Sequence, residues 1–325
     1  MTTAVIAVDK FRGTATATEA VDALAAGLEA LGVTCHRAPM ADGGEGTVEA
    51  FGGPNRTTTV TGPLGDPVVA AWRLDGRLAV IEMAAASGLA LVGEANDAVA
   101  ASTEGTGELI DAAVGRGARH VIVGLGGSAT TDGGLGAVRA LYPHHRLRGV
   151  RLDVACDVET TFVEAAAVFA PQKGATPAQV ELLRRRLERL VDVYERDYGV
   201  DVRDLSGSGA AGGLGGGLAA LGGNLVSGVE LIADETGLPE LVEAADIVVT
   251  GEGRLDRESF EGKVVGGVAQ IAEDAGVPVM AVVGEVADGV SAPFPVFSLS
   301  DRYGRERAVT ETLWCLRDLA ATLVG

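Results

Sequence analysis

The chain has 325 residues, enough for two domains, with 47% hydrophobic and only 4% aromatic residues and a formal net charge of −19. This charge repels nucleic acid and anionic membranes at long range, so we expect partners of neither class. The N-terminus lacks a basic region followed by an apolar stretch, and no segment has about 18 uncharged apolar residues in succession, which predicts a cytoplasmic protein.

Short β-branched runs alternate with helical patterns along much of the chain. In chain order, strands are predicted at 4–8, 36–39, 120–125, 152–156, 246–250, 278–283 and 295–299, and helices at 18–31, 108–114, 263–273 and 310–323. Most of these strands are continuously apolar, which is typical of parallel strands that are buried on both faces. The alternation predicts an α/β fold with a doubly wound, mostly parallel sheet.

Two blocks interrupt this alternation. Residues 55–83 show alternating Thr and Val with glycine and proline turns, which predicts an antiparallel meander. Residues 159–232 contain a charged helix near 177–198 and a glycine-rich helix near 210–221. We therefore predict a second, mixed α+β lobe that is inserted into the first domain, with the active site in the cleft between them. The expected boundaries are 1–52, 100–158 and 235–325 for the Rossmann-like domain, and 53–99 and 159–234 for the inserted lobe.

Several predicted strands end in loops that are rich in glycine and acidic residues. These loops are 40–46, 124–134, the region of 157, and a turn at 251–256. Because the carboxyl ends of parallel strands open into one crevice, we expect the loops to converge. For each single loop, an ordinary polar turn is the alternative.

Two of the glycine loops match nucleotide-binding patterns. Residues 124–129 fit G-x-G-x-x-A and residues 207–212 fit G-x-G-x-x-G, but the acid that holds a ribose in dinucleotide sites is missing about 20 residues after the first loop. A nicotinamide enzyme is therefore disfavoured. Two interpretations of these glycine loops remain: their backbone amides bind oxyanions at a helix N-terminus, or the loops are tight turns that bind no ligand. The candidate nucleotide-binding residues are Gly124, Gly126, Gly127, Ser128, Thr130, Asp132, Gly207, Gly209, Gly212 and Gly213.

Other catalytic patterns are absent from the sequence. Gly262-Lys263 is not followed by Ser or Thr as in a Walker loop, and no serine lies in a G-x-S-x-G elbow. The four histidines and three cysteines lack metal-ligand spacing, which argues against a zinc site and against a disulfide framework.

Lysine occurs at only three positions, Lys10, Lys173 and Lys263, each within a few residues of a glycine. A compact ammonium suits phosphate oxygens better than the wide guanidinium fork. Six carboxylates are predicted in the same crevice: Asp9, Asp42, Glu45, Asp157, Glu252 and Asp256. Any one of them is equally consistent with a helix cap, but together with the lysines they supply the groups that phosphoryl transfer needs.

The motifs resemble those of the bacterial glycerate kinase family, class I. The similarity extends over nearly the whole chain and rests on VIAVDKFRG, ADGGEGT, TGPLGDP, IEMAAASGL, GTGELI, GLGGSATTDGG, ACDV, PQKGA, GAAGGLGGGL and TGEGRLDRESFEGK. The resemblance implies ATP- and Mg²⁺-dependent phosphorylation of D-glycerate to 2-phosphoglycerate by a two-lobed α/β enzyme. A kinase for another small hydroxy acid or sugar acid, or a non-catalytic paralogue that binds the same ligands, is the alternative.

The sequence departs from the family pattern in places. Lys10 stands where the family commonly has Ser, Arg12 takes its second basic position, Thr131 replaces Asn, Glu159-Thr160-Thr161 replaces Asn-Pro-Leu, and the 141–151 segment is some tens of residues shorter. The candidate catalytic residues are Asp9, Lys10, Arg12, Asp42, Glu45, Lys173, Arg254 and Lys263, with Asp42 or Glu45 to orient the hydroxyl. The candidate magnesium ligands are Asp157, Glu252 and Asp256.

Overall fold

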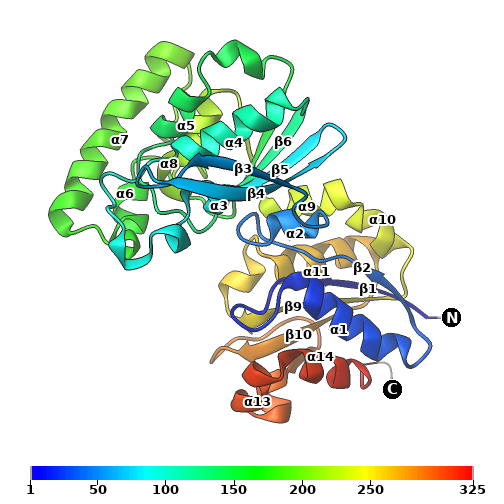
Figure 1. Cartoon of the computed structure of the whole chain (residues 1–325). Coiled ribbons are helices and arrows are strands. Elements are labelled where there is room, and N and C mark those ends of the chain that lie inside the picture. Colours follow the sequence, from blue (N-terminus) through cyan, green and yellow to red (C-terminus); the bar gives the residue numbers. More distant parts are fainter. Residues whose placement is uncertain (1, 324–325) are drawn as a thin grey trace. The chain divides into compact units, whose positions relative to one another are not determined.

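The computed structural model describes residues 2–323 and divides into two compact units (Figure 1). Unit 1 contains Met1–Asp42 and Val229–Gly325, and unit 2 contains Gly43–Gly228. Unit 2 is therefore one continuous insertion into unit 1. No helix in the described part of the chain is long and apolar enough to cross a membrane.

Unit 1 is built on a parallel sheet of five strands. Its order is β11 (Val296–Ser298), β10 (Val279–Val286), β9 (Ile247–Leu255), β1 (Thr3–Val8) and β2 (Thr34–Arg37). The two central strands are in register, with Val8 beside Gly251, and their apolar runs are buried on both faces as expected for parallel strands.

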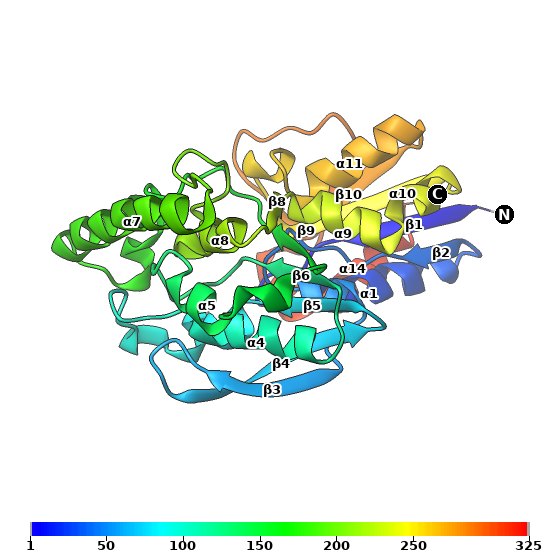
Figure 2. The same ribbon diagram turned by 90° about the horizontal axis from the view of Figure 1, so that it is seen from above.

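Helices cover both faces of this sheet (Figures 1 and 2). One face packs against α1 (Ala17–Glu29) and α14 (Thr312–Ala320) around Ile6, Leu24 and Leu316. On the other face, Val265 of α11 (Val264–Ala275) packs with Ala281 and Val283. The remaining helices of unit 1 are α9 (Gly228–Thr236), α10 (Leu238–Glu243), η5 (Glu258–Phe260), α12 (Leu299–Tyr303) and α13 (Arg305–Thr310).

Unit 2 contains a mixed sheet of six strands. Its order is β3 (Arg56–Thr61), β4 (Pro67–Asp75), β5 (Leu78–Glu82), β6 (His120–Gly124), β7 (Arg151–Ala155) and β8 (Asn224–Val226). The first three strands pair antiparallel, which confirms the predicted meander, and the pairs from β5 to β8 are parallel.

The helices of unit 2 are mostly short. They are α2 (Thr47–Ala50), α3 (Ala84–Ser87), η1 (Leu89–Leu91), η2 (Gly93–Ala95), α4 (Glu104–Gly115), α5 (Leu135–Ala140), η3 (His144–Leu147), α6 (Ala165–Phe169), η4 (Pro171–Lys173), α7 (Pro177–Tyr198) and α8 (Ala210–Ala220). The long α7 begins with a capping box between Thr176 and Gln179 and is followed by Gly199 as its C-cap, and it buries Leu187 and Tyr194. The short 141–151 segment holds the single turn η3.

The α/β fold with a parallel sheet and an inserted mixed unit agrees with the sequence prediction, but the boundaries differ. Residues 100–158 were expected in the first domain and lie in unit 2, because β6 and β7 pair with β5. Buried parallel strands have the same apolar pattern in either sheet, so the pattern cannot show which sheet a strand joins. Unit 2 is also uninterrupted, whereas two separate inserted blocks were expected.

Candidate functional site

Unit 1 contains a charged cavity of about 360 Å³ at the carboxyl ends of β1 and β9. Its lining residues are Asp9, Lys10, Arg12, Asp42, Glu252, Gly253, Arg254, Asp256, Lys263 and Glu285. Eight of these ten were singled out from the sequence as catalytic or metal-binding candidates. The structure thus brings together in unit 1 eight of the charges that were predicted to converge. Glu45, Asp157 and Lys173, which were expected in the same crevice, belong to unit 2 and do not line this cavity.

Most of the turn predicted at 251–256 is instead part of a strand. β9 continues to Leu255 and pairs with β10 as far as Val286, so this correction moves the expected strand end from 250 to 255. Its glycines are explained by close packing, because a Cβ on Gly251 would lie 1.9 Å from the carbonyl oxygen of Val282, and one on Gly253 would lie 3.1 Å from the amide nitrogen of Arg12. The alternation of glycine with Glu252 and Arg254 places both charges at the cavity.

The loop after β1 is held beside β9. The amide of Asp9 donates to the carbonyl of Gly251 at 2.9 Å, and the Asp9 carboxylate accepts from the amide of Lys10 at 2.7 Å. The Lys10 ammonium lies 3.6 Å from the same carboxylate oxygen. Asp9 therefore orients Lys10 at the cavity wall.

Two carboxylates of this cavity are poorly solvated. Burial raises the pKa of Asp9 to about 6, with Lys10 opposing the rise and Asp42 adding to it. Burial likewise raises the pKa of Glu252 to about 7, and Asp9 and Asp256 contribute repulsion. The Oε1 atom of Glu252 is buried and has no hydrogen-bond partner among the described residues. Such a carboxylate is expected to gain from a cation.

Cations surround these acids. Lys263 lies at the N-cap position of α11, and its ammonium is 3.2 Å from a carboxylate oxygen of Glu258. Burial lowers its pKa, but the bond to Glu258 and the nearby acids raise it more, so the net shift is upward. Asp256 accepts hydrogen bonds from the amide and hydroxyl of Ser259 at 3.2 and 3.3 Å. Arg254 lies 3.6 Å from Glu285.

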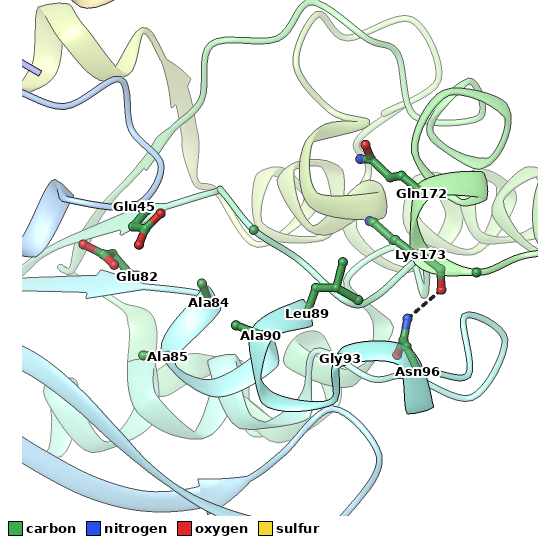
Figure 3. A pocket seen from close by; sticks show the side chains of 12 residues that line it. Glu45, Glu82, Ala84, Ala85, Leu89, Ala90, Gly93, Asn96, Gln172 and Lys173 are labelled. Carbon is green, nitrogen blue, oxygen red and sulfur yellow. Dashed lines mark hydrogen bonds between the residues drawn. The ribbon is translucent and has the colours of Figure 1, made fainter. Parts of the chain in front are cut away.

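Unit 2 contains a larger cavity of about 800 Å³ (Figure 3). Its walls are formed by Glu45, Glu82, Ala84, Ala85, Leu89, Ala90, Gly93, Asn96, Gly127, Gln172, Lys173 and Gly174. Figure 3 shows Glu45 and Glu82 at one end, apolar side chains in the middle, and Lys173, Gln172 and Asn96 at the other end. The cavity therefore offers an apolar surface between two polar ends.

The glycine loop after β6 reaches this cavity through Gly127, which has φ +63°. The loop is anchored by hydrogen bonds from the amide of Leu89 to the carbonyl of Gly127 at 2.8 Å, and from the amide of Ala129 to the carbonyl of Ser87 at 3.0 Å. Within residues 2–323, the backbone amides of 126–128 donate no hydrogen bond to the protein. Successive unpaired amides in a glycine turn are a common binding site for anions.

Lys173 is almost fully buried, with 3% of its surface exposed. Its ammonium donates to the carbonyl oxygen of Thr130 at 2.5 Å and lies 5.9 Å from the centre of the Phe169 ring. Burial lowers the pKa of Lys173 to about 7, and Asp132 opposes this shift. Burial thus disfavours the charged form of this lysine, and a bound anion would favour it.

Other nucleotide-binding candidates have packing roles. The carboxylate of Asp132 accepts four hydrogen bonds of 2.9 to 3.1 Å, from the amide and hydroxyl of Thr103 and from the amides of Gly134 and Gly136. Gly207, Gly209, Gly212 and Gly213 leave no room for a Cβ, because each faces backbone or side-chain atoms at 3.0 Å or less. None of these five candidates lines the two cavities described above.

We expect Gly212→Ala to destabilise the fold by at least about 3 kcal/mol, since its Cβ would lie 2.0 Å from the carbonyl oxygen of Thr130 and its φ is +70°. Gly222→Ala is the matched control, because Gly222 has φ +90° but no atom within 4 Å of the added Cβ. Urea denaturation of both variants separates the clash from the backbone strain. Equal losses of stability would contradict the packing role.

Asp157 lies in unit 2, after β7, and its carboxylate accepts from the amide of Gly228 at 3.3 Å. It lines neither cavity, unlike Glu252 and Asp256. In the described part of the chain, no three His, Cys, Asp or Glu side chains are grouped as metal ligands.

The sequence patterns did not point to four of the residues that line the two cavities, which are Glu82, Asn96, Gln172 and Glu285. Glu82 ends β5 inside the predicted meander and could have been found as an acid at the end of an apolar run, whereas Asn96 has no local signature.

Comparison with known proteins identifies the family. A model described as the glycerate kinase family matches residues 4–144 and 142–295. The chain is 41% identical to a glycerate kinase of Halalkalibacterium halodurans, over 90% of this chain and 88% of that protein. It is 39% identical to a glycerate 2-kinase of Escherichia coli (strain K12), over 88% of this chain and 86% of that protein.

The structural comparison agrees. The crystal structure of a chain assigned as glycerate kinase 2 from Salmonella typhimurium LT2 matches with a TM-score of 0.86 and 38% sequence identity, covering 99% of this chain and 98% of that one. The fold and these matches define a phosphotransferase with an alcohol group as acceptor. The chain belongs to the glycerate kinase family.

Proposed function

We propose that this chain transfers the γ-phosphoryl group of ATP to the 2-hydroxyl of D-glycerate in the presence of Mg²⁺, in the cytoplasm. The observation that carries this proposal is the cavity of unit 1, where cations and carboxylates from the loop after β1, from β9 and from the start of α11 line one space of about 360 Å³. Phosphoryl transfer needs cations for the anionic groups and acids for a metal and for the attacking hydroxyl. The family similarity supports the acceptor.

Glycerate binding is assigned to the cations of unit 1. Lys10, Arg12, Arg254 and Lys263 all line this cavity, so that a small carboxylate can pair with more than one of them. Arg12 is exposed, whereas Lys10 is largely buried beside Asp9. We assign the substrate carboxylate to Arg12 and Arg254, and the transferred phosphoryl group to Lys10 and Lys263.

Glu252 and Asp256 fit a magnesium ion. The Oε1 of Glu252 is buried without a hydrogen-bond partner in the described residues, and burial raises the pKa of its carboxyl. A bound cation would contact this oxygen and would favour the ionised carboxylate. Mg²⁺ is commonly held in such enzymes by one or two carboxylates together with phosphate oxygens, so a dense ligand cluster is not required. When bound, the ion would neutralise phosphate charge.

Nucleotide binding is assigned to unit 2. The unpaired amides of 126–128 and the buried ammonium of Lys173 can receive phosphate oxygens, and the apolar middle of the cavity can receive the nucleoside. Glu45 lies at the opposite end of this cavity and is suited to accept hydrogen bonds from ribose hydroxyls. Gly212 and Gly213 pack against Thr130 and Gly133 of this loop, and Asp132 anchors it through its hydrogen bond to the hydroxyl of Thr103. Gly207 and Gly209 pack instead against residues 156–161.

The proton of the attacking hydroxyl is assigned to Asp42, which shares the cavity with the glycerate-binding cations. The glycerate oxygen forms its bond to the γ-phosphorus as the bond from that phosphorus to the ADP oxygen breaks, and the hydroxyl proton passes to the carboxylate. Asp9 holds Lys10 in place during this step.

The proposal is tested by measuring ADP release with ATP, Mg²⁺ and a panel of hydroxy acids, including both enantiomers of glycerate, glycolate, lactate, tartronate and gluconate. We expect turnover with D-glycerate and a single phosphorus NMR signal for the 2-phosphate. A clear preference for a larger acid would contradict the acceptor. A thermal shift with glycerate but no ADP release would favour a ligand-binding protein without catalysis.

A further inference from the structure

Asn96 and Lys173 together hold the carbonyl oxygens of the glycine loop in unit 2. The Nδ2 of Asn96 donates to the carbonyl of Ala129 at 3.1 Å and to that of Lys173 at 2.9 Å, the second of which is drawn in Figure 3. The Nζ of Lys173 donates to the carbonyl of Thr130 at 2.5 Å. The segments around Asn96 and Lys173 are thus joined to the glycine loop at two consecutive carbonyls, those of Ala129 and Thr130.

These contacts determine which backbone groups of the loop remain available. The carbonyls of 129 and 130 are occupied by side-chain donors and that of Gly127 by the amide of Leu89, whereas the amides of 126–128 have no acceptor in the described chain. A loop with occupied carbonyls and unpaired amides presents a positive concavity. Without the two side chains, the loop would lose hydrogen bonds at 129 and 130 and would be freer to turn its amides away.

The state of Asn96 points to a positioning role. Both of its polar contacts use Nδ2, and Oδ1 is buried with no partner in the described residues. An unpaired buried acceptor lowers the stability of the fold, so the side chain is not optimised for stability alone. Exchanging the amide atoms would place oxygen against two carbonyl oxygens, which fixes the orientation.

We infer that Asn96 is a positioning residue for the anion-binding amides of Gly126, Gly127 and Ser128, and that Lys173 both braces this loop and pairs with the phosphate oxygens of the bound nucleotide. This inference rests on the proposed nucleotide role of the unit 2 cavity. Lys173 has donors beyond the one used for Thr130 and lines the same cavity as Gly127, so the two roles are compatible.

The test for Asn96 is the variant Asn96→Asp, which keeps the shape but replaces the donor by an acceptor facing two carbonyls. We expect the KM for ATP and the Kd for ADP to rise about tenfold or more, with the KM for glycerate unchanged. Asn55→Asp is the matched control, because Nδ2 of Asn55 also donates to a backbone carbonyl, that of Leu74 at 3.0 Å, away from the cavity. Unchanged ADP affinity in Asn96→Asp, or an equal change in Asn55→Asp, would overturn the role.

The test for Lys173 uses the pH dependence of ADP binding, measured by titration calorimetry without glycerate. Because burial lowers the pKa of Lys173 to about 7, the ammonium is present at pH 6 and largely lost at pH 8, and Asp132 is the nearby charge that favours it. Glu45 and Glu82 line the same cavity. We expect Lys173→Met to weaken ADP about tenfold at pH 6 and by less at pH 8, whereas an equal loss at both values would contradict direct pairing.

Because ADP itself titrates in this pH range, each variant is compared with the wild type at the same pH, so that the contribution of ADP cancels. Lys173→Arg serves as a second variant in case Lys173→Met does not fold. The guanidinium of Lys173→Arg would retain its charge at both pH values. The fall in ADP affinity that deprotonation of Lys173 causes between pH 6 and pH 8 should therefore be absent from this variant, and only the pH dependence of ADP itself should remain. Retention of the wild-type difference would overturn the inference.

These binding experiments do not use the acceptor, so they separate this inference from the proposed function. If the assignment of D-glycerate as the acceptor is wrong, the changes in ADP affinity of the Asn96 and Lys173 variants should still be observed. Glycerate turnover with normal ADP affinity in both Asn96→Asp and Lys173→Met would refute only the roles inferred for these two residues.

Discussion

Replacement of either Lys10 or Lys263 by methionine is expected to lower kcat about 100- to 1000-fold, in line with the loss of one charge-stabilising donor from a transition state. Both ammonium groups line the charged cavity of unit 1, where Lys10 lies 3.6 Å from Asp9 and Lys263 lies 3.2 Å from Glu258. Methionine keeps the length and apolar stem of lysine, so the charge is the main change. The measurement is ADP release at saturating ATP and D-glycerate.

Arg257→Met is the control for these lysine variants, since Arg257 is exposed in the same loop region and does not line the cavity. It should retain activity within a factor of a few. If Lys10→Met and Lys263→Met both remain fully active while correctly folded, the assignment of the phosphoryl group to these lysines is wrong. A loss of activity in Arg257→Met of similar size would show that net charge, rather than position, is responsible.

Glu252→Gln is expected to make the protein more stable and at least about 100-fold less active. The carboxylate of Glu252 is largely buried, its Oε1 has no hydrogen-bond partner in the described residues, and burial raises its pKa from 4.5 to about 7. Ionising it in the folded state therefore costs free energy, which the neutral amide avoids. Activity should fall because the amide is a weaker magnesium ligand.

The sign of the pH dependence follows from the raised pKa. In the folded protein Glu252 keeps its proton up to about pH 7, whereas in the unfolded chain it loses the proton near pH 4.5. Between these pH values the folded state therefore binds more protons than the unfolded state, and the free energy of unfolding falls as the pH rises. Asp9, whose pKa is raised to about 6, acts in the same direction. We expect the stabilisation by Glu252→Gln to be about 2 kcal/mol larger at pH 8 than at pH 5.

Urea denaturation at the two pH values measures this difference, and Glu261→Gln is the control because Glu261 is exposed and does not line the cavity. The control should show no comparable dependence on pH. A Glu252→Gln variant that loses stability at pH 8, or one that keeps full activity with Mg²⁺, would contradict the assignment of Glu252 as a metal ligand held in an unfavourable setting.

Local sequence patterns were sufficient to predict the class of fold and much of the charged site of unit 1. Continuous apolar runs such as 4–8 and 278–283 are strands because a sheet buried on both faces accepts them. Since these strands are parallel, their carboxyl ends lie on one edge, and Asp9 and Glu252 could be expected at a common cavity from their positions in the sequence. The meander at 55–83 was likewise predictable from its turns and alternation.

The folded arrangement was needed to show which sheet β6 and β7 join, because an apolar run carries no information on its neighbour. It was also needed to distinguish packing from binding for glycines that look alike in sequence. Gly212 has a backbone oxygen 2.0 Å from its missing Cβ, whereas Gly127 lines a cavity beside unpaired amides. Asn96 gained its importance from contacts with residues 33 and 77 positions away, and such contacts form only when the chain folds, so no local pattern could indicate them.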